Sequence, residues 1–145
     1  MENSTTSSSS QSKLSVVIWE FVSLTKPRVN LLIMFTAIVG MLLAQGRELH
    51  YELILLASLG IGFAASAAAI INHVIDQRID SVMDRTKGRP LVKGNIKPLH
   101  AIYFAIFLSI TSLLMLYIFV NTLTAILTFI SIIIYSFIYS IYLKN

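Results

Sequence analysis

The chain has 145 residues, of which 56% are hydrophobic and 12% charged, and its mean hydropathy is +0.78. A sequence this short and this apolar is too hydrophobic for a water-soluble domain, so we expect a lipid bilayer around it. The net charge of +4 does not indicate nucleic acid, because the basic residues lie beside apolar segments without interleaved aromatic side chains. The absence of cysteine excludes disulfide frameworks, thiolate nucleophiles and cysteine-based zinc sites.

The N-terminal segment, residues 1–13, is rich in Ser and Thr and has too few apolar side chains to pack, so we predict a disordered tail. It lacks the apolar centre of a secretory signal. Residues 14–145 are predicted to form a membrane domain, which begins with an amphipathic stretch containing Trp19, a residue type that favours the membrane interface. Thr25 and Pro27 predict the start of the next helix, with Thr as its cap and Pro in its first turn.

Four membrane spans are expected in the rest of the chain, since a helix needs about 20 apolar residues to cross a bilayer. Their predicted ranges are 27–45, 53–75, 99–120 and 122–143. The last two are separated only around Asn121, so they should form a tight helical hairpin. The small residues between Gly60 and Ala69 favour the close approach of another helix. The sequence therefore predicts an all-α, polytopic membrane helical bundle.

Lys and Arg residues are distributed unevenly over the connections between these spans. Three lie in the N-terminal flank, six in the loop 76–98 and one in the C-terminal tail, whereas the connection between the first two spans has only Arg47. Basic residues gather on the cytoplasmic side of a membrane, so we predict that both termini and the loop are cytoplasmic. Lys26, Arg28 and Lys144 then lie on the same side as the loop and can converge on one site.

Polar side chains recur at four-residue spacing where the second span meets this loop. Asn72, Asp76, Asp80 and Asp84 would lie along one stripe of a helix, where two carboxylates at this spacing repel each other by roughly 0.2–0.5 kcal/mol. No Lys or Arg lies three or four residues from Asp80 to offset that repulsion. Mg²⁺ takes oxygen ligands and typically sits between carboxylates and substrate phosphates. We therefore predict a magnesium site at Asn72, Asp76 and Asp80; the alternative is a solvated helix end.

Other polar and aromatic residues near this stripe are candidates for substrate contacts. Arg85, Lys87 and Arg89 can neutralise phosphate oxygens as fixed charges. His73, next to the stripe, can move protons or serve as a hydrogen-bonded structural group. Tyr135 belongs to an aromatic face of the fourth span, which can shield a carbocation or simply pack.

The polar stripe and its loop resemble the first aspartate-rich motif of the intramembrane aromatic prenyltransferases. The loop segment that carries the resemblance is DRTKGRPL at residues 84–91. Two further segments, LTKPRV at 24–29 and AASAAA at 64–69, are most similar to the haem O synthases (protohaem IX farnesyltransferases) within that family. The tail YSIYLK at 139–144 also fits, although the second residue of the family's basic pair is Asn145 here.

This resemblance implies an inner-membrane bacterial transferase that binds farnesyl diphosphate through Mg²⁺ and transfers the farnesyl group to a vinyl group of protohaem IX, giving haem O. The implied metal ligands are Asn72, Asp76 and Asp80. The implied diphosphate contacts are Arg85, Lys87 and Arg89, with Lys26, Arg28 and Lys144 as weaker candidates. Neutralising the leaving group in a water-poor cavity eases ionisation of the allylic C–O bond.

The family has about nine membrane helices and two aspartate-rich motifs that face each other across a central cavity. This chain has four expected spans and one motif, so it looks like an N-terminal half. Its expected protein partners are a missing C-terminal half and haem A synthase. The alternatives are a noncatalytic membrane fragment or half-subunit, and a prenyltransferase with another acceptor such as 4-hydroxybenzoate. An ion pathway is disfavoured, because these carboxylates lie at a span end and not near the midplane.

Overall fold

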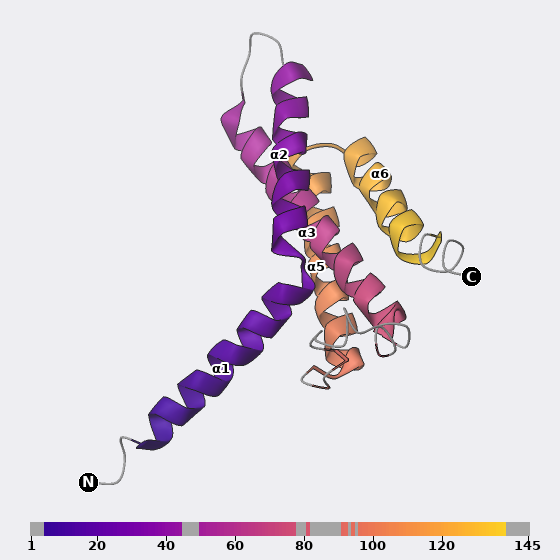
Figure 1. The fold of residues 1–145 in the computed structure, drawn as a ribbon. Helices are drawn as coiled ribbons and strands as arrows, with labels where there is room; N and C mark the ends of the chain where they lie inside the picture. Colours follow the sequence, from indigo (N-terminus) through magenta and orange to yellow (C-terminus); the bar gives the residue numbers. More distant parts are fainter. Residues whose placement is uncertain are drawn as a thin grey trace.

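A computed structural model describes the backbone of residues 5–44, 50–77, 81, 91–92, 94 and 96–138, with side chains from residue 15 to residue 136 of these ranges. Within them the chain is helical and contains no strand (Figure 1). The elements are α1 (Thr5–Leu24), α2 (Pro27–Ala44), α3 (Tyr51–Ile75), α5 (Pro98–Phe119), α6 (Thr122–Ile133) and the π-helical turn η1 (Ile134–Ile138). The predicted all-α membrane bundle is confirmed.

The first three predicted spans correspond to α2, α3 and α5, each of which is long and apolar enough to cross a membrane. The hairpin expected at Asn121 is also present: α5 ends at Phe119, and Asn121 Oδ1 accepts a hydrogen bond from the N–H of Thr124 at 2.7 Å at the start of α6. The fourth predicted span is helical from Thr122 to Ile138. Its remaining residues lie outside the described part of the chain, so its full length stays a prediction.

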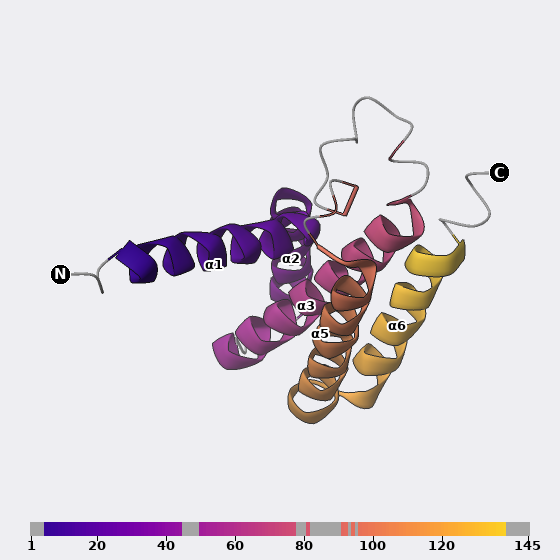
Figure 2. The same cartoon turned by 90° about the horizontal axis from the view of Figure 1, so that it is seen from below.

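Helix α3 occupies the centre of the bundle, with α2, α5 and α6 packed around it (Figures 1 and 2). The small residues of α3 allow the neighbouring helices to approach it closely. A Cβ atom on Gly60 would lie 2.8 Å from Leu116 Cδ2 of α5, and one on Gly62 would lie 2.8 Å from Met34 Sδ of α2. Ser112 Oγ of α5 also donates a hydrogen bond to the Gly60 carbonyl at 2.6 Å. The close helix packing predicted for these small residues is therefore confirmed.

An apolar cluster closes the end of the bundle where α3 ends and α5 begins, which we call the elbow end. Leu24, the last residue of α1, is fully buried there in a cluster with Ile70 of α3 and with Leu91 and Ile96, which precede α5. Gln77 Nε2 donates a hydrogen bond to the Leu91 carbonyl at 3.0 Å. These contacts hold both flanks of the aspartate-rich loop against the bundle.

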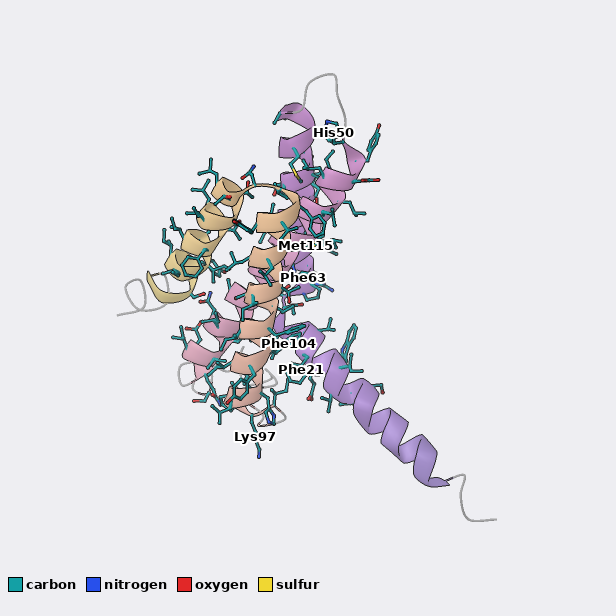
Figure 3. The ribbon with its side chains drawn as sticks, turned by 180° about the vertical axis from the view of Figure 1, so that it is seen from behind. Phe21, His50, Phe63, Lys97, Phe104 and Met115 are labelled. Atoms are coloured by element: carbon teal, nitrogen blue, oxygen red, sulfur yellow. The ribbon has the colours of Figure 1, made fainter. Side chains whose placement is uncertain are left out.

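Helix α1 leaves the bundle at the elbow end (Figure 2). Residues 5–13, which belong to the segment that we predicted to be disordered, form its first half. The C-terminal half of α1 touches the bundle. The rings of Phe21 and Phe104 meet edge to face there, with centroids 5.3 Å apart and an interplanar angle of 75° (Figure 3).

A two-residue elbow joins α1 to α2. We predicted Thr25 as the cap of α2; instead its hydroxyl donates to the Val22 carbonyl at 2.8 Å and closes α1. Lys26 follows with φ of 49°, the left-handed conformation that commonly ends a helix. The Lys26 carbonyl then accepts the N–H groups of Val29 and Asn30, each at 3.0 Å. Helix α2 starts at Pro27, as predicted.

Candidate functional site

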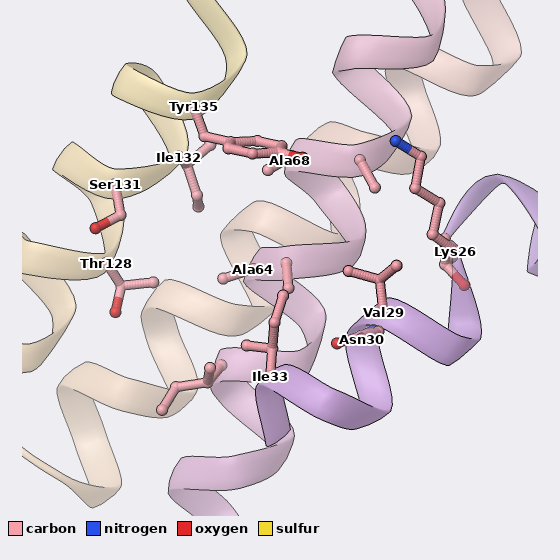
Figure 4. Close-up of a pocket in the computed structure, with 14 residues that line it drawn as sticks. Lys26, Val29, Asn30, Ile33, Ala64, Ala68, Thr128, Ser131, Ile132 and Tyr135 are labelled. Carbon is pink, nitrogen blue, oxygen red and sulfur yellow. The ribbon is translucent and has the colours of Figure 1, made fainter. Parts of the chain in front are cut away.

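A cavity of about 380 Å³ lies between α2, α3 and α6 (Figure 4). Its walls are mainly aliphatic: Val29 and Ile33 come from α2, Ala64 and Ala68 from α3, and Ile132 from α6. A volume of this size falls within the roughly 300–1,000 Å³ typical of small-molecule sites. The arrangement can therefore hold an apolar ligand inside the bundle.

Polar side chains mark one end of this cavity. Lys26 of the elbow and Tyr135 of η1 both line it and lie at the same end, on either side of Ala68 (Figure 4). Thr128 and Ser131 line the cavity from α6. The cavity thus combines an apolar body with a cation and a phenol at the elbow end.

Asn30 is a polar cavity residue that the sequence analysis missed. Its Nδ2 donates hydrogen bonds to the Gly62 carbonyl at 3.0 Å and to Ser66 Oγ at 2.6 Å. The Ser66 hydroxyl in turn donates to the Gly62 carbonyl at 2.8 Å. These bonds fix α2 against α3 at the cavity wall. Asn30 Oδ1 is buried and has no hydrogen-bond partner within the described part of the chain.

Asn72 and Asp76 continue the face of α3 that lines the cavity. Ala65 and Ala68 belong to this face, and four-residue steps from Ala68 lead to Asn72 and then to Asp76, each with a drift of only about 40° around the helix. Both side chains are buried, with exposures of 4% for Asn72 and 9% for Asp76. The structure therefore places two of the three predicted metal ligands beyond the polar end of the cavity.

The donors on this face fit the chemistry of a magnesium site but do not complete one. Asn72 and Asp76 offer amide and carboxylate oxygens, the hard ligands that Mg²⁺ prefers. Within the described residues, no group of three or more His, Cys, Asp or Glu side chains is placed to hold a metal ion. A metal bound at Asn72 and Asp76 therefore needs further oxygen ligands.

The other predicted site residues fall into two groups. Five of them lie outside the described residues: Asp80, Arg85, Lys87, Arg89 and Lys144. Arg28 is described but does not line the cavity; it lines a separate groove at the elbow, whereas Lys26 lines both. His73, which follows Asn72, is buried with 7% exposure. Of the predicted site residues that the structure describes, Asn72, Asp76 and Lys26 thus lie on the cavity or on the helix face that continues it, whereas Arg28 lies outside it.

Comparison with known proteins gives one family. Residues 33–145 match the UbiA prenyltransferase family. The chain is similar over 126 residues to protoheme IX farnesyltransferases from Alkalilimnicola ehrlichii (47% identical), Pseudoalteromonas atlantica (46%) and Legionella pneumophila strain Lens (47%). These matches cover 87% of this chain but only 42%, 41% and 43% of the relatives, so the chain spans less than half of their length. No solved structure matches the chain.

Proposed function

We propose, from the premise that this chain belongs to the UbiA prenyltransferase family, that it forms the prenyl-diphosphate-binding part of an enzyme that transfers a farnesyl group to protohaem IX and so makes haem O. The observation that carries the proposal is the apolar cavity whose α3 face continues into buried Asn72 and Asp76. Its aliphatic walls suit a prenyl chain. Its elbow end, with the ammonium group of Lys26, suits the diphosphate.

Magnesium is the cofactor that these donors support. Asn72 and Asp76 would hold the ion, together with Asp80, and the substrate phosphates would supply further oxygens. When bound, Mg²⁺ neutralises charge on the diphosphate. The described side chains supply oxygen donors for this role on the cavity face of α3, at the end where Lys26 also lies.

The residues of the chain have separate roles in the transfer. Lys26 would stabilise the negative charge on the departing diphosphate, with further cations from the loop and tail. The further cations are Arg85, Lys87, Arg89 and Lys144. As the allylic C–O bond breaks, the aliphatic walls exclude water and the ring of Tyr135 shields the cation. The allylic carbon then bonds to a vinyl carbon of protohaem IX, and water adds to the resulting cation and loses a proton to give the hydroxyl group.

The same proposal extends to location and partners. The described residues include three helices long and apolar enough to span a membrane, and we place them in the bacterial inner membrane with both termini and the aspartate-rich loop cytoplasmic. Its partners would be a C-terminal half that completes the cavity and haem A synthase, which would take up haem O. Reporter fusions at Arg47 should score as exoplasmic and fusions at Lys93 as cytoplasmic. A cytoplasmic Arg47 would contradict this orientation.

Haem O formation tests the proposed activity. The chain is coexpressed with the C-terminal remainder of the Alkalilimnicola ehrlichii relative in a host without haem O synthase, and haems are identified by mass spectrometry. We expect haem O from the parent chain and at least a hundredfold less from Asp76→Asn, which preserves side-chain volume but removes the charge that the metal needs. Lys97→Gln, which removes an exposed charge at the same end, should leave the yield unchanged. Equal yields from Asp76→Asn and the parent would exclude the metal role.

A further inference from the structure

Asn30 places a carboxamide in the α2 wall of the cavity, between the aliphatic side chains of Val29 and Ile33. Its nitrogen is bonded to α3, because Nδ2 donates to the Gly62 carbonyl at 3.0 Å and to Ser66 Oγ at 2.6 Å. These two bonds use both hydrogens of the amide group. The oxygen is therefore the part of this side chain that remains for a role in the cavity.

The partners of the nitrogen fix the orientation of the Asn30 carboxamide. The Gly62 carbonyl can only accept a hydrogen bond, so the amide nitrogen and not the oxygen must face it. The Ser66 hydroxyl donates its own hydrogen to the same carbonyl at 2.8 Å, so it accepts from Asn30. A rotation that exchanged the nitrogen and the oxygen would lose both bonds. The oxygen thus points away from α3, and Figure 4 shows it directed from α2 toward the cavity.

The Asn30 oxygen is an unneutralised dipole end beside an apolar cavity. Oδ1 is buried, and no residue that the structure describes donates a hydrogen bond to it. Among aliphatic walls the dielectric constant is low, so the field of the partial negative charge is stronger than it would be in water. Because Oδ1 is itself buried, it acts on the cavity through this field and not through direct contact. The field favours positive charge inside the cavity.

Asn30 lies one helical turn deeper in the cavity than its polar end. Lys26 marks that end, and the N–H of Asn30 bonds to the Lys26 carbonyl at 3.0 Å, the four-residue step of a helix, which is about 6 Å along the axis. Tyr135 lines the cavity from the opposite wall (Figure 4). A prenyl diphosphate with its phosphates at the polar end would therefore have the first carbons of its chain between these two walls.

We propose that the Asn30 carboxamide stabilises the allylic cation formed during prenyl transfer, an inference that rests on the proposed function of the cavity. When the C–O bond breaks, its electron pair stays on the diphosphate, and the first and third carbons of the prenyl chain share the positive charge. The field of Oδ1 stabilises this charge more than it stabilises the neutral substrate, which accelerates the ionisation. The bonds to α3 hold the dipole in place before the substrate binds.

Two matched ligands test this role by binding alone. In one farnesyl diphosphate analogue a protonated nitrogen replaces the third carbon of the prenyl chain, and in the other this carbon is kept, saturated and uncharged. Calorimetry gives both dissociation constants for the purified 145-residue protein in detergent with Mg²⁺. We expect the parent to prefer the charged analogue. Asn30→Leu should reduce this preference about tenfold, less than the roughly hundredfold effect of a polar group in direct contact with the reacting charge.

Ser66→Ala is the matched control, because it removes one hydrogen bond between α2 and α3 but leaves the Asn30 oxygen in place. It should leave the preference unchanged. An unchanged preference in Asn30→Leu, or equal binding of the two analogues to the parent, would overturn the role of Asn30 alone; the second comparison requires no variant to fold. If neither analogue bound the parent, the proposed prenyl cavity would be wrong, and this inference with it.

Discussion

Substitutions at two alanines of α3 can distinguish the role of the cavity from that of the packed core. Ala65 lines the cavity, whereas Ala67 is fully buried and belongs to the same apolar cluster as Leu24 and Ile70. Ala65→Leu adds methyl and methylene groups to open space, so it should shorten the prenyl chain that the cavity accepts. We expect the completed enzyme to lose at least tenfold in farnesyl transfer while geranyl transfer is retained, as measured by mass spectrometry of the products.

Ala67→Leu is the matched substitution in the core. Added volume in a packed core typically destabilises a protein by about 1–3 kcal/mol, so this variant should lose membrane-inserted protein and both activities together. If Ala65→Leu transferred farnesyl as well as the parent, the cavity would not hold the prenyl chain.

The polar residues on the cavity face differed in how well the sequence could predict them. Asn72 and Asp76 repeat at four-residue spacing, which keeps them on one helical face, and this face continues the face of α3 whose alanines line the cavity. Asn30 carried no such signal. It is a single polar residue in an apolar span, and its partners Gly62 and Ser66 lie 32 and 36 residues away in the sequence. A long-range contact of this kind appears only once the helices are packed.

At the scale of helices, alanine substitutions at Gly60 and Gly62 of α3 test how closely α3 packs against its neighbours, and Gly40 of α2 serves as the control. Gly60→Ala should destabilise the bundle by about 1–3 kcal/mol, because the added Cβ meets Leu116, which is fully buried and has little space to move. Gly62→Ala should cost less, since Met34 is flexible and only half-buried. Gly40→Ala meets nothing within 4 Å and should stabilise α2 by about 0.5–1 kcal/mol.

Unfolding of the three variants in detergent, followed by circular dichroism, gives the order of these stabilities. A Gly60→Ala variant as stable as Gly40→Ala would show that α3 and α5 are not closely packed at this point.

Hydropathy predicted the long apolar helices because bilayer thickness sets the length of an expected span, and α2 and α3 begin and end within two residues of the ranges expected from the sequence. The helical first half of α1 could not be predicted this way. Its Ser- and Thr-rich composition indicates only that it has no apolar face to pack. Thr25 was misassigned because the same residue type can cap a helix start or bond back to a helix end.

At the scale of the whole molecule, the chain matches only 41–43% of the length of its relatives. Among the described residues, the oxygen donors proposed to hold the metal are Asn72 and Asp76, which lie on one face of α3 beyond one end of the cavity. We therefore expect this chain alone to make no haem O detectable by mass spectrometry in a host without haem O synthase, although it inserts into the membrane. Haem O formed by the chain alone would show that it, or an oligomer of it, supplies a complete site.

The location of the prenyl chain tests most directly whether the cavity between α2, α3 and α6 binds farnesyl diphosphate. A farnesyl diphosphate analogue with a photoreactive group on its prenyl tail is irradiated with the chain in membranes containing Mg²⁺, and the labelled peptides are sequenced. We expect labelling of the cavity residues Val29, Ile33 and Ile132, reduced by excess farnesyl diphosphate and by Asp76→Asn. Labelling of the outward face of α5, such as at Phe107, that persists under both conditions would contradict it.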